Sequence, residues 1–165
     1  MSFVEMLSPD EKIDLGSDYI NIVKFFENSD AAITAIKRNQ FIDEIIRLFL
    51  LQWGFTLDEI KTAFAQFWRK QNEDKLDKTI GPVFNRLVDF LQDKKEIQDC
   101  FITEMITIAY IDCKLTHEEK ESVRYLKEKF NLQDEEFEKL QSNGLELATV
   151  IKNLSITYRK FRGKI

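Results

Sequence analysis

Residues 101–140 read FITEMITIAYIDCKLTHEEKESVRYLKEKFNLQDEEFEKL, and this stretch determines the fold class that the sequence predicts. Apolar residues recur at helical spacing through its first part and cover most of the circumference, which predicts a largely buried helix ending near Ile111. A charged helix is expected to begin near Thr116 and to end at Asn131 in a left-handed conformation. Another helix then starts near Asp134. The stretch therefore predicts a succession of helices joined by short turns.

The first of these turns carries the most distinctive chemistry. Thr116 stands three residues before Glu119, which predicts a capping box in which each side chain bonds to the backbone N–H of the other residue. Asp112 and Glu119 are also hard oxygen donors that could hold a divalent cation together with nearby carbonyl groups. An EF-hand is excluded, because Lys114 stands where that loop needs a second acid. His117 is the only histidine, and we expect it to be exposed, because zinc needs three or four nitrogen or sulfur ligands. Glu119 thus has two candidate roles, helix cap and metal ligand.

The same residues resemble the TerB-like family of tellurite-resistance proteins. In that family a helix ends in an Asp-Gly-x-apolar-Ser/Thr-x-x-Glu turn, and a Gly-Leu-Ser-x-Glu-Glu segment starts the helix after next. Here residues 112–119 read DCKLTHEE and residues 131–136 read NLQDEE, so that Cys113 and Asn131 replace the two glycines. The resemblance implies an all-helical, non-enzymatic accessory protein in tellurite or stress resistance, whose acidic turn gathers cations or whose surface docks at a membrane complex.

An earlier segment repeats the pattern of the acidic turn. Residues 52–59 read QWGFTLDE and lie sixty positions before residues 112–119. Thr56 and Glu59 fall on the predicted capping pair of the later turn, but Gln52 replaces the aspartate. We interpret this as an internal duplication of a helix-turn-helix unit, which predicts two pseudo-repeated halves and at most one cation site.

Composition and periodicity set the fold class. The chain has 165 residues, fourteen phenylalanines and two tryptophans, with few glycines and prolines and no alternating apolar run of strand length. These features predict an all-α protein, a single compact domain of about eight helices. Within it we expect N-terminal helices in 1–40, a TerB-like core in 41–140 and, after a break at 142–144, a C-terminal helix over 144–162.

The first forty residues contain another helix-start signature. Ser8 is a cap residue, Pro9 suits the first helical position, and Glu11 stands three residues after the cap. Gly16 is expected to split the helix that follows, with Ser17 capping its second part.

The charge of the chain is unevenly distributed. The net charge is −5, yet the residues from Lys152 onward include five basic residues and no acidic one, so that the first 151 residues carry −10. An acidic body repels nucleic acids and suits cations or basic protein partners. The basic and aromatic residues 158–162 are interpreted as a solvated last helical turn, or alternatively as a peripheral contact with an anionic membrane or nucleic acid.

The two cysteines indicate a reducing environment. Cys100 and Cys113 are thirteen residues apart, or roughly 20 Å along a helix, which is too far for a disulfide. No signal peptide is visible at the start of the chain, and no apolar run is long enough to span a bilayer. We therefore expect a cytoplasmic protein.

Enzyme activity is not expected. A single histidine leaves no base for a serine or cysteine nucleophile, and glycine-rich phosphate loops are absent. Trp53 and Trp68 lie in an aromatic-rich region and are either core residues or, if exposed, a docking patch for a protein partner or a second copy in a homodimer. Besides the TerB-like function, an acidic helical immunity or inhibitor protein that masks a basic toxin fits the charge. A small-ligand binder with a cleft between the halves is a third interpretation.

Overall fold

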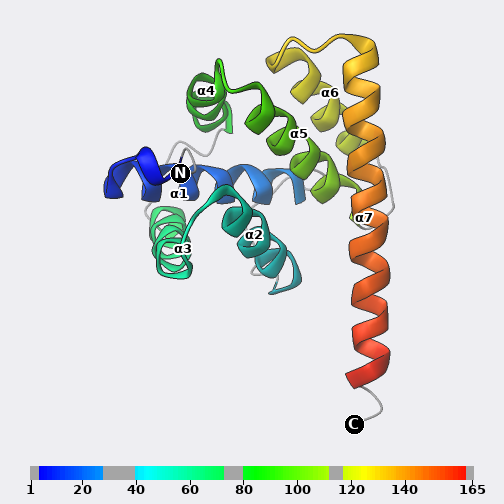
Figure 1. Cartoon of the computed structure of the whole chain (residues 1–165), viewed down its shortest axis with the longest axis horizontal. Coiled ribbons are helices and arrows are strands. Elements are labelled where there is room, and N and C mark those ends of the chain that lie inside the picture. Colours follow the sequence, from blue (N-terminus) through cyan, green and yellow to red (C-terminus); the bar gives the residue numbers. More distant parts are fainter. Residues whose placement is uncertain (1–3, 28–39, 73–79, 112–116, 163–165) are drawn as a thin grey trace. The chain divides into compact units, whose positions relative to one another are not determined.

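The computed structural model describes residues 4–27, 40–72, 80–111 and 117–162, and all regular structure in these ranges is helical (Figure 1). The elements are a short 3₁₀ helix η1 (Val4–Met6) and the α-helices α1 (Pro9–Glu27), α2 (Gln40–Trp53), α3 (Leu57–Asn72), α4 (Ile80–Leu91), α5 (Lys95–Tyr110), α6 (His117–Lys129) and α7 (Asp134–Arg162). The predicted all-α class is confirmed. In the described ranges there are seven α-helices and one 3₁₀ turn, where the sequence predicted about eight helices.

Contacts between residues divide the chain into two compact units. The first unit is built from α1 to α4 and the second from α5 to α7. The division falls where α4 ends, close to residue 90.

In the first unit, α1 is the central helix. It begins with the predicted capping box, since the Ser8 N–H donates to Glu11 Oε1 at 3.3 Å and the Glu11 N–H donates to Ser8 Oγ at 3.2 Å. The predicted split at Gly16 is wrong, because α1 continues without interruption to Glu27. A side chain at Gly16 would place its Cβ 2.8 Å from the Cβ of Ala63 in α3. This glycine therefore lets two helices approach closely and does not end one.

The core of the first unit draws on all four helices. Fully buried apolar side chains come from α1, α2, α3 and α4, namely Tyr19, Ile20, Ile22, Val23, Phe26, Ile42, Ile46, Leu50, Ile60, Ala63, Phe67, Phe84 and Leu87. Burial of a large apolar side chain contributes about 1.5–3 kcal/mol. On α4, Arg86 donates to both carboxylate oxygens of Asp18 at 3.0 and 3.1 Å, which fastens this helix to α1. These hydrogen bonds to Asp18 raise the pKa of Arg86, although its partial burial acts to lower it.

In the second unit, nine of the last ten residues of α5 are buried, as its all-round apolar pattern predicted. It packs along α7 and against α6. The predicted break at 142–144 and the separate helix over 144–162 are wrong, because α7 is one helix of 29 residues. A Cβ at Gly144 would lie 2.5 Å from the Cγ2 of Ile106 and 3.2 Å from the carbonyl oxygen of Thr103. Gly144 is therefore a close-contact site between α5 and α7 inside a continuous helix.

Candidate functional site

The turn between α2 and α3 combines a helix stop with a helix start. Gly54 adopts a φ of 106°, the Phe55 N–H donates to the Leu50 carbonyl at 3.1 Å, and the Gly54 N–H donates to the Leu51 carbonyl at 3.0 Å. These two bonds form a Schellman motif, which closes the end of α2. The predicted capping box at the start of α3 is also confirmed, because the N–H groups of Thr56 and Glu59 donate to each other's side chains at 2.9 and 3.2 Å.

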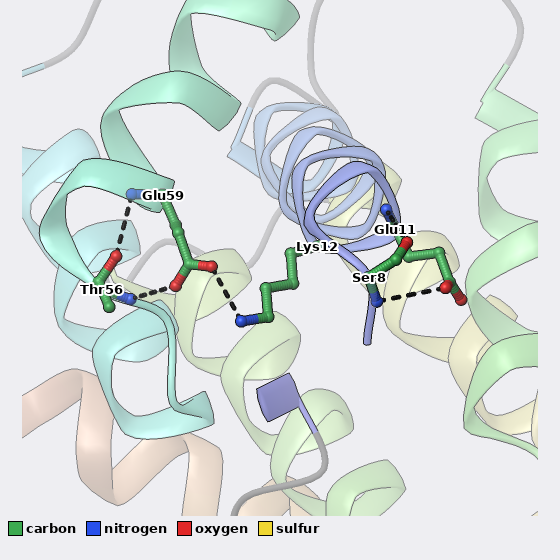
Figure 2. A network of polar contacts seen from close by, with 5 residues as sticks. All are labelled: Ser8, Glu11, Lys12, Thr56 and Glu59. Atoms are coloured by element: carbon green, nitrogen blue, oxygen red, sulfur yellow. Dashed lines mark hydrogen bonds and ion pairs between the residues drawn. The ribbon is translucent and has the colours of Figure 1, made fainter. Parts of the chain in front are cut away.

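Glu59 is further engaged by a residue of α1. Figure 2 shows Lys12 reaching from α1 toward Glu59, and its Nζ lies 3.2 Å from Glu59 Oε2. Burial acts to raise the pKa of Glu59, but the hydrogen bonds from Thr56 and Lys12 outweigh it and hold this pKa below its ordinary value. Both carboxylate oxygens of Glu59 thus serve the cap and an ion pair.

The matching turn that carries the predicted cation site is not described. Asp112 and Thr116 lie outside the described residues, and Glu119 is placed only as a backbone position in the first turn of α6. Among the side chains that the structure does describe, no group of three or more His, Cys, Asp or Glu residues is placed to hold a metal ion.

The turn between α6 and α7 repeats the geometry found at Gly54. Asn131 has a φ of 53°, the Leu132 N–H donates to the Lys127 carbonyl at 3.0 Å, and the Asn131 N–H donates to the Glu128 carbonyl at 3.2 Å. The left-handed stop predicted at Asn131 is therefore confirmed. Asp134 follows as the first residue of α7.

Beside this turn lies a groove of about 700 Å³ between α6 and α7, to whose lining α5 contributes Tyr110. Its lining residues are Tyr110, Val123, Arg124, Lys127, Glu128, Asn131, Leu132, Asp134, Phe137, Glu138 and Gln141. Val123 and Leu132 are buried and supply an apolar base. Gln141 Nε2 donates to the Tyr110 hydroxyl at 2.7 Å, which fixes a polar group in the groove.

A resident cation lies at the groove's mouth. The Lys127 ammonium pairs with the carboxylate of Asp134 and lies 5.8 Å from the centroid of the Phe137 ring. The hydrogen bond and charge of Lys127 lower the pKa of Asp134, whose side chain is 82% exposed. A carboxylate beside an aromatic face is a favourable environment for an ammonium or guanidinium group. In this structure Lys127 itself occupies that environment.

The two tryptophans lie in the first unit. Trp53 is 6% exposed and makes an edge-to-face contact with Tyr19, their ring centroids 5.1 Å apart. Trp68 is half-buried, and the centroid of its ring lies 5.0 Å from that of the Phe67 ring. Trp53 is therefore a core residue, and little of its side-chain surface is available to a partner.

Sequence reasoning missed a buried ion pair in the first unit. Lys24 exposes only 1% of its surface, and its Nζ lies 2.7 Å from Asp43 Oδ1 and 3.6 Å from Glu27 Oε2. The same ammonium lies 5.8 Å from the centroid of the Trp68 ring. One signal was available, because Asp43 falls on the buried face of α2 with Ile42 and Ile46. The groove residues were missed because only the fold brings α5, α6 and α7 together.

Comparison with known proteins adds no relative: the chain matches no protein-family profile, and neither curated proteins nor solved structures give a match. None of the described helices combines the length and the apolar character needed to cross a membrane.

Proposed function

We propose that this chain is a non-enzymatic, TerB-like accessory protein that binds a basic segment of a partner protein in the groove between α6 and α7. The observation that carries the proposal is the Lys127 ammonium held between Asp134 and the Phe137 ring. A lysine or arginine side chain of a partner would make the same kind of contact with Asp134 and Phe137. Because the Asp134 side chain is 82% exposed, a cation from outside can compete for it.

The charge around the groove supports a basic occupant. Acidic residues form the first turn of α7, at Asp134, Glu135 and Glu136, and Glu138 follows on the same helix. Three carboxylates line the groove itself, those of Glu128, Asp134 and Glu138, together with two cations, Arg124 and Lys127. This arrangement favours positively charged partners and speeds their encounter, in a manner that falls with ionic strength.

The binding test uses tetralysine as the probe. In an NMR titration of the full chain we expect saturable shifts at the amides of Asp134, Phe137 and Gln141, with a Kd on the order of 0.1–1 mM that weakens as salt is added. The double variant with Asp134→Asn and Glu138→Gln should lose this binding.

Two further variants make the test specific. Glu135→Gln removes one charge from the same helical turn outside the groove and should bind tetralysine nearly as well as the unmodified chain. Lys127→Met removes the resident cation and should bind several-fold more tightly. The proposal is wrong if the groove amides do not move, or if Glu135→Gln weakens binding as much as the double variant.

The proposed TerB-like assignment also implies a cation site and a pseudo-repeat. The capping box of Thr56 and Glu59 supports the repeat, because residues 112–119 share the capping spacing. A cation held by Asp112 and Glu119 would give saturable calorimetric binding of Ca²⁺, Mg²⁺, Mn²⁺ or Zn²⁺ that Asp112→Ala abolishes and Glu59→Gln preserves. A flat titration of the unmodified chain would exclude the site.

An immunity or inhibitor protein is the second candidate, supported by the acidic first turn of α7 beside the same groove. The two functions differ in the partner, which is a basic toxin or nuclease in one case and a component of a tellurite- or stress-resistance complex in the other. Genomic neighbours of the gene, followed by a binding assay with the purified neighbour product, distinguish them.

A further inference from the structure

The C-terminal half of α7 exposes apolar side chains in a regular stripe. Leu147, Val150, Ile151 and Leu154 follow the spacing of one helical face, and Val150 and Leu154 are 49% and 52% exposed. The adjacent face of the same helix differs, because Leu140, Gly144 and Ala148, which are spaced four residues apart, are buried. Figure 1 shows the later half of α7 continuing past the ends of α5 and α6, its neighbours in the second unit.

This spacing is typical of helices that pair along a seam. Apolar residues separated by three and four positions place one continuous stripe against a partner helix. In the sequence the same spacing continues at Tyr158 and Phe161, and the helix itself continues to Arg162. Eighteen residues from 145 to 162 span roughly 27 Å, enough for about two and a half heptads.

The charges along α7 indicate which helix would cover the stripe. Its first part, residues 134–146, contains five acidic residues and one lysine, whereas the chain from residue 152 onward contains five basic residues and no acidic one. In an antiparallel pair centred on Leu154 the overlap covers residues 146–162, so that Glu146, the last of these acidic residues, meets the basic end of the second copy. A parallel pair would instead place the two basic ends side by side.

We propose that the chain forms a homodimer in which the C-terminal halves of two α7 helices pack antiparallel about Leu154. In this register position 150 faces position 158 of the second copy, and Glu146 faces position 162, which is an arginine. The seam buries the exposed stripe. The pairing of Glu146 with Arg162, and the separation of the two basic ends, fix the direction. This interface involves a different face of the molecule from the groove between α6 and α7, so either proposal can fail without the other.

Sedimentation velocity on the full chain tests the dimer. Over a range on the order of 1–200 µM we expect the mass to rise from 19.6 kDa toward twice that value, with weaker association at high salt. Leu154→Glu should keep the chain monomeric throughout this range. Because Leu154 is 52% exposed, this variant should retain the helical circular dichroism of the unmodified chain.

A matched control is available on the same helix. Leu145 is 44% exposed but lies off the stripe, and Leu145→Glu should dimerise like the unmodified chain. Orientation is tested in a chain carrying Cys100→Ser and Cys113→Ser. Under oxidation, Leu154→Cys should crosslink two copies, whereas Leu147→Cys should not, because position 147 meets itself only in a parallel pair.

Three outcomes would overturn the proposal. The first is a monomer at every concentration, and the second is a dimer that Leu154→Glu leaves intact. The third is a monomeric chain that floats with vesicles containing phosphatidylserine and loses flotation in Leu154→Glu, which would assign the stripe to a membrane surface. Crosslinking at position 147 would retain the dimer and overturn its antiparallel orientation.

Discussion

Each of the two units contains a trio of side chains, in which a lysine pairs with an aspartate and lies beside an aromatic ring. The charged pair of this trio is buried in the first unit and exposed to solvent in the second. In the first unit, Lys24 pairs with Asp43 and lies 5.8 Å from the ring of Trp68, and it exposes 1% of its surface. In the second unit, Lys127 pairs with Asp134 and lies 5.8 Å from the ring of Phe137, yet the Lys127 and Asp134 side chains are 33% and 82% exposed.

Because the charged pair is buried in one trio and exposed in the other, we expect the first trio to stabilise the fold and the second to take part in binding. A buried pair cannot exchange partners without leaving a charge in the core, so it serves to hold helices together. An exposed pair contributes little to stability and can give way to a cation from another molecule. We therefore expect mutations of the first trio to affect folding and mutations of the second to affect binding.

The largest expected effect is on the buried pair. Asp43→Ala leaves the Lys24 ammonium in the core without its closest carboxylate, and we expect the free energy of unfolding to fall by about 3–5 kcal/mol. Urea denaturation followed by circular dichroism measures the change. Asp134→Ala should leave the urea midpoint unchanged within error.

A rescue variant shows whether the loss comes from the isolated charge. Lys24→Met combined with Asp43→Leu removes both charges at similar volume and should recover most of the stability. Equal urea midpoints for Asp43→Ala and Asp134→Ala would contradict the contrast between the trios.

The glycines at close contacts between helices, one in each unit, allow the packing of the two units to be compared. Gly144→Ala puts a methyl group 2.5 Å from Ile106 Cγ2, and we expect a loss of about 1–3 kcal/mol from overpacking. Gly16→Ala, with its nearest contact at 2.8 Å, should cost less. Gly81→Ala is the control, because a Cβ there meets nothing within 4 Å, and it should be neutral or stabilise by up to about 1 kcal/mol. Thermal unfolding ranks the three, and a stabilised Gly144→Ala would refute the close contact.

The smallest expected effect is on pH dependence. The pKa of Glu59 is below its ordinary value of 4.5, so its contribution to stability is present above that value and is lost as the pH falls through the folded-state pKa. Glu59→Gln should therefore be less stable than the unmodified chain near neutral pH, with a gap that closes in acid. Urea midpoints measured from about pH 6 to pH 3 test this.

Asp134→Asn is the comparison for the pH series. The pKa of Asp134 is also lowered, so any effect has the same sign, but its pair with Lys127 is exposed and screened by solvent. The gap for Asp134→Asn should be smaller at every pH. If the stability difference between Glu59→Gln and the unmodified chain widened in acid, the predicted direction of the pH dependence would be wrong.

Local signals in the sequence were sufficient for three helix ends. Ser8 with Glu11, and Thr56 with Glu59, form their capping boxes as predicted, and Asn131 adopts the left-handed conformation. These features depend on atoms within a few residues of one another, so the residue types and spacings specify them.

The sequence by itself therefore determined the all-helical class, most of the helix starts and stops, and the acidic body with its basic end. Only the tertiary structure decided that Gly16 and Gly144 lie inside continuous helices, because their role depends on atoms of a neighbouring helix. It also decided which of two similar lysine–carboxylate pairs is buried, and which residues of α5, α6 and α7 line a groove. Burial is a property of packing between segments distant in the chain, and local spacing does not specify it.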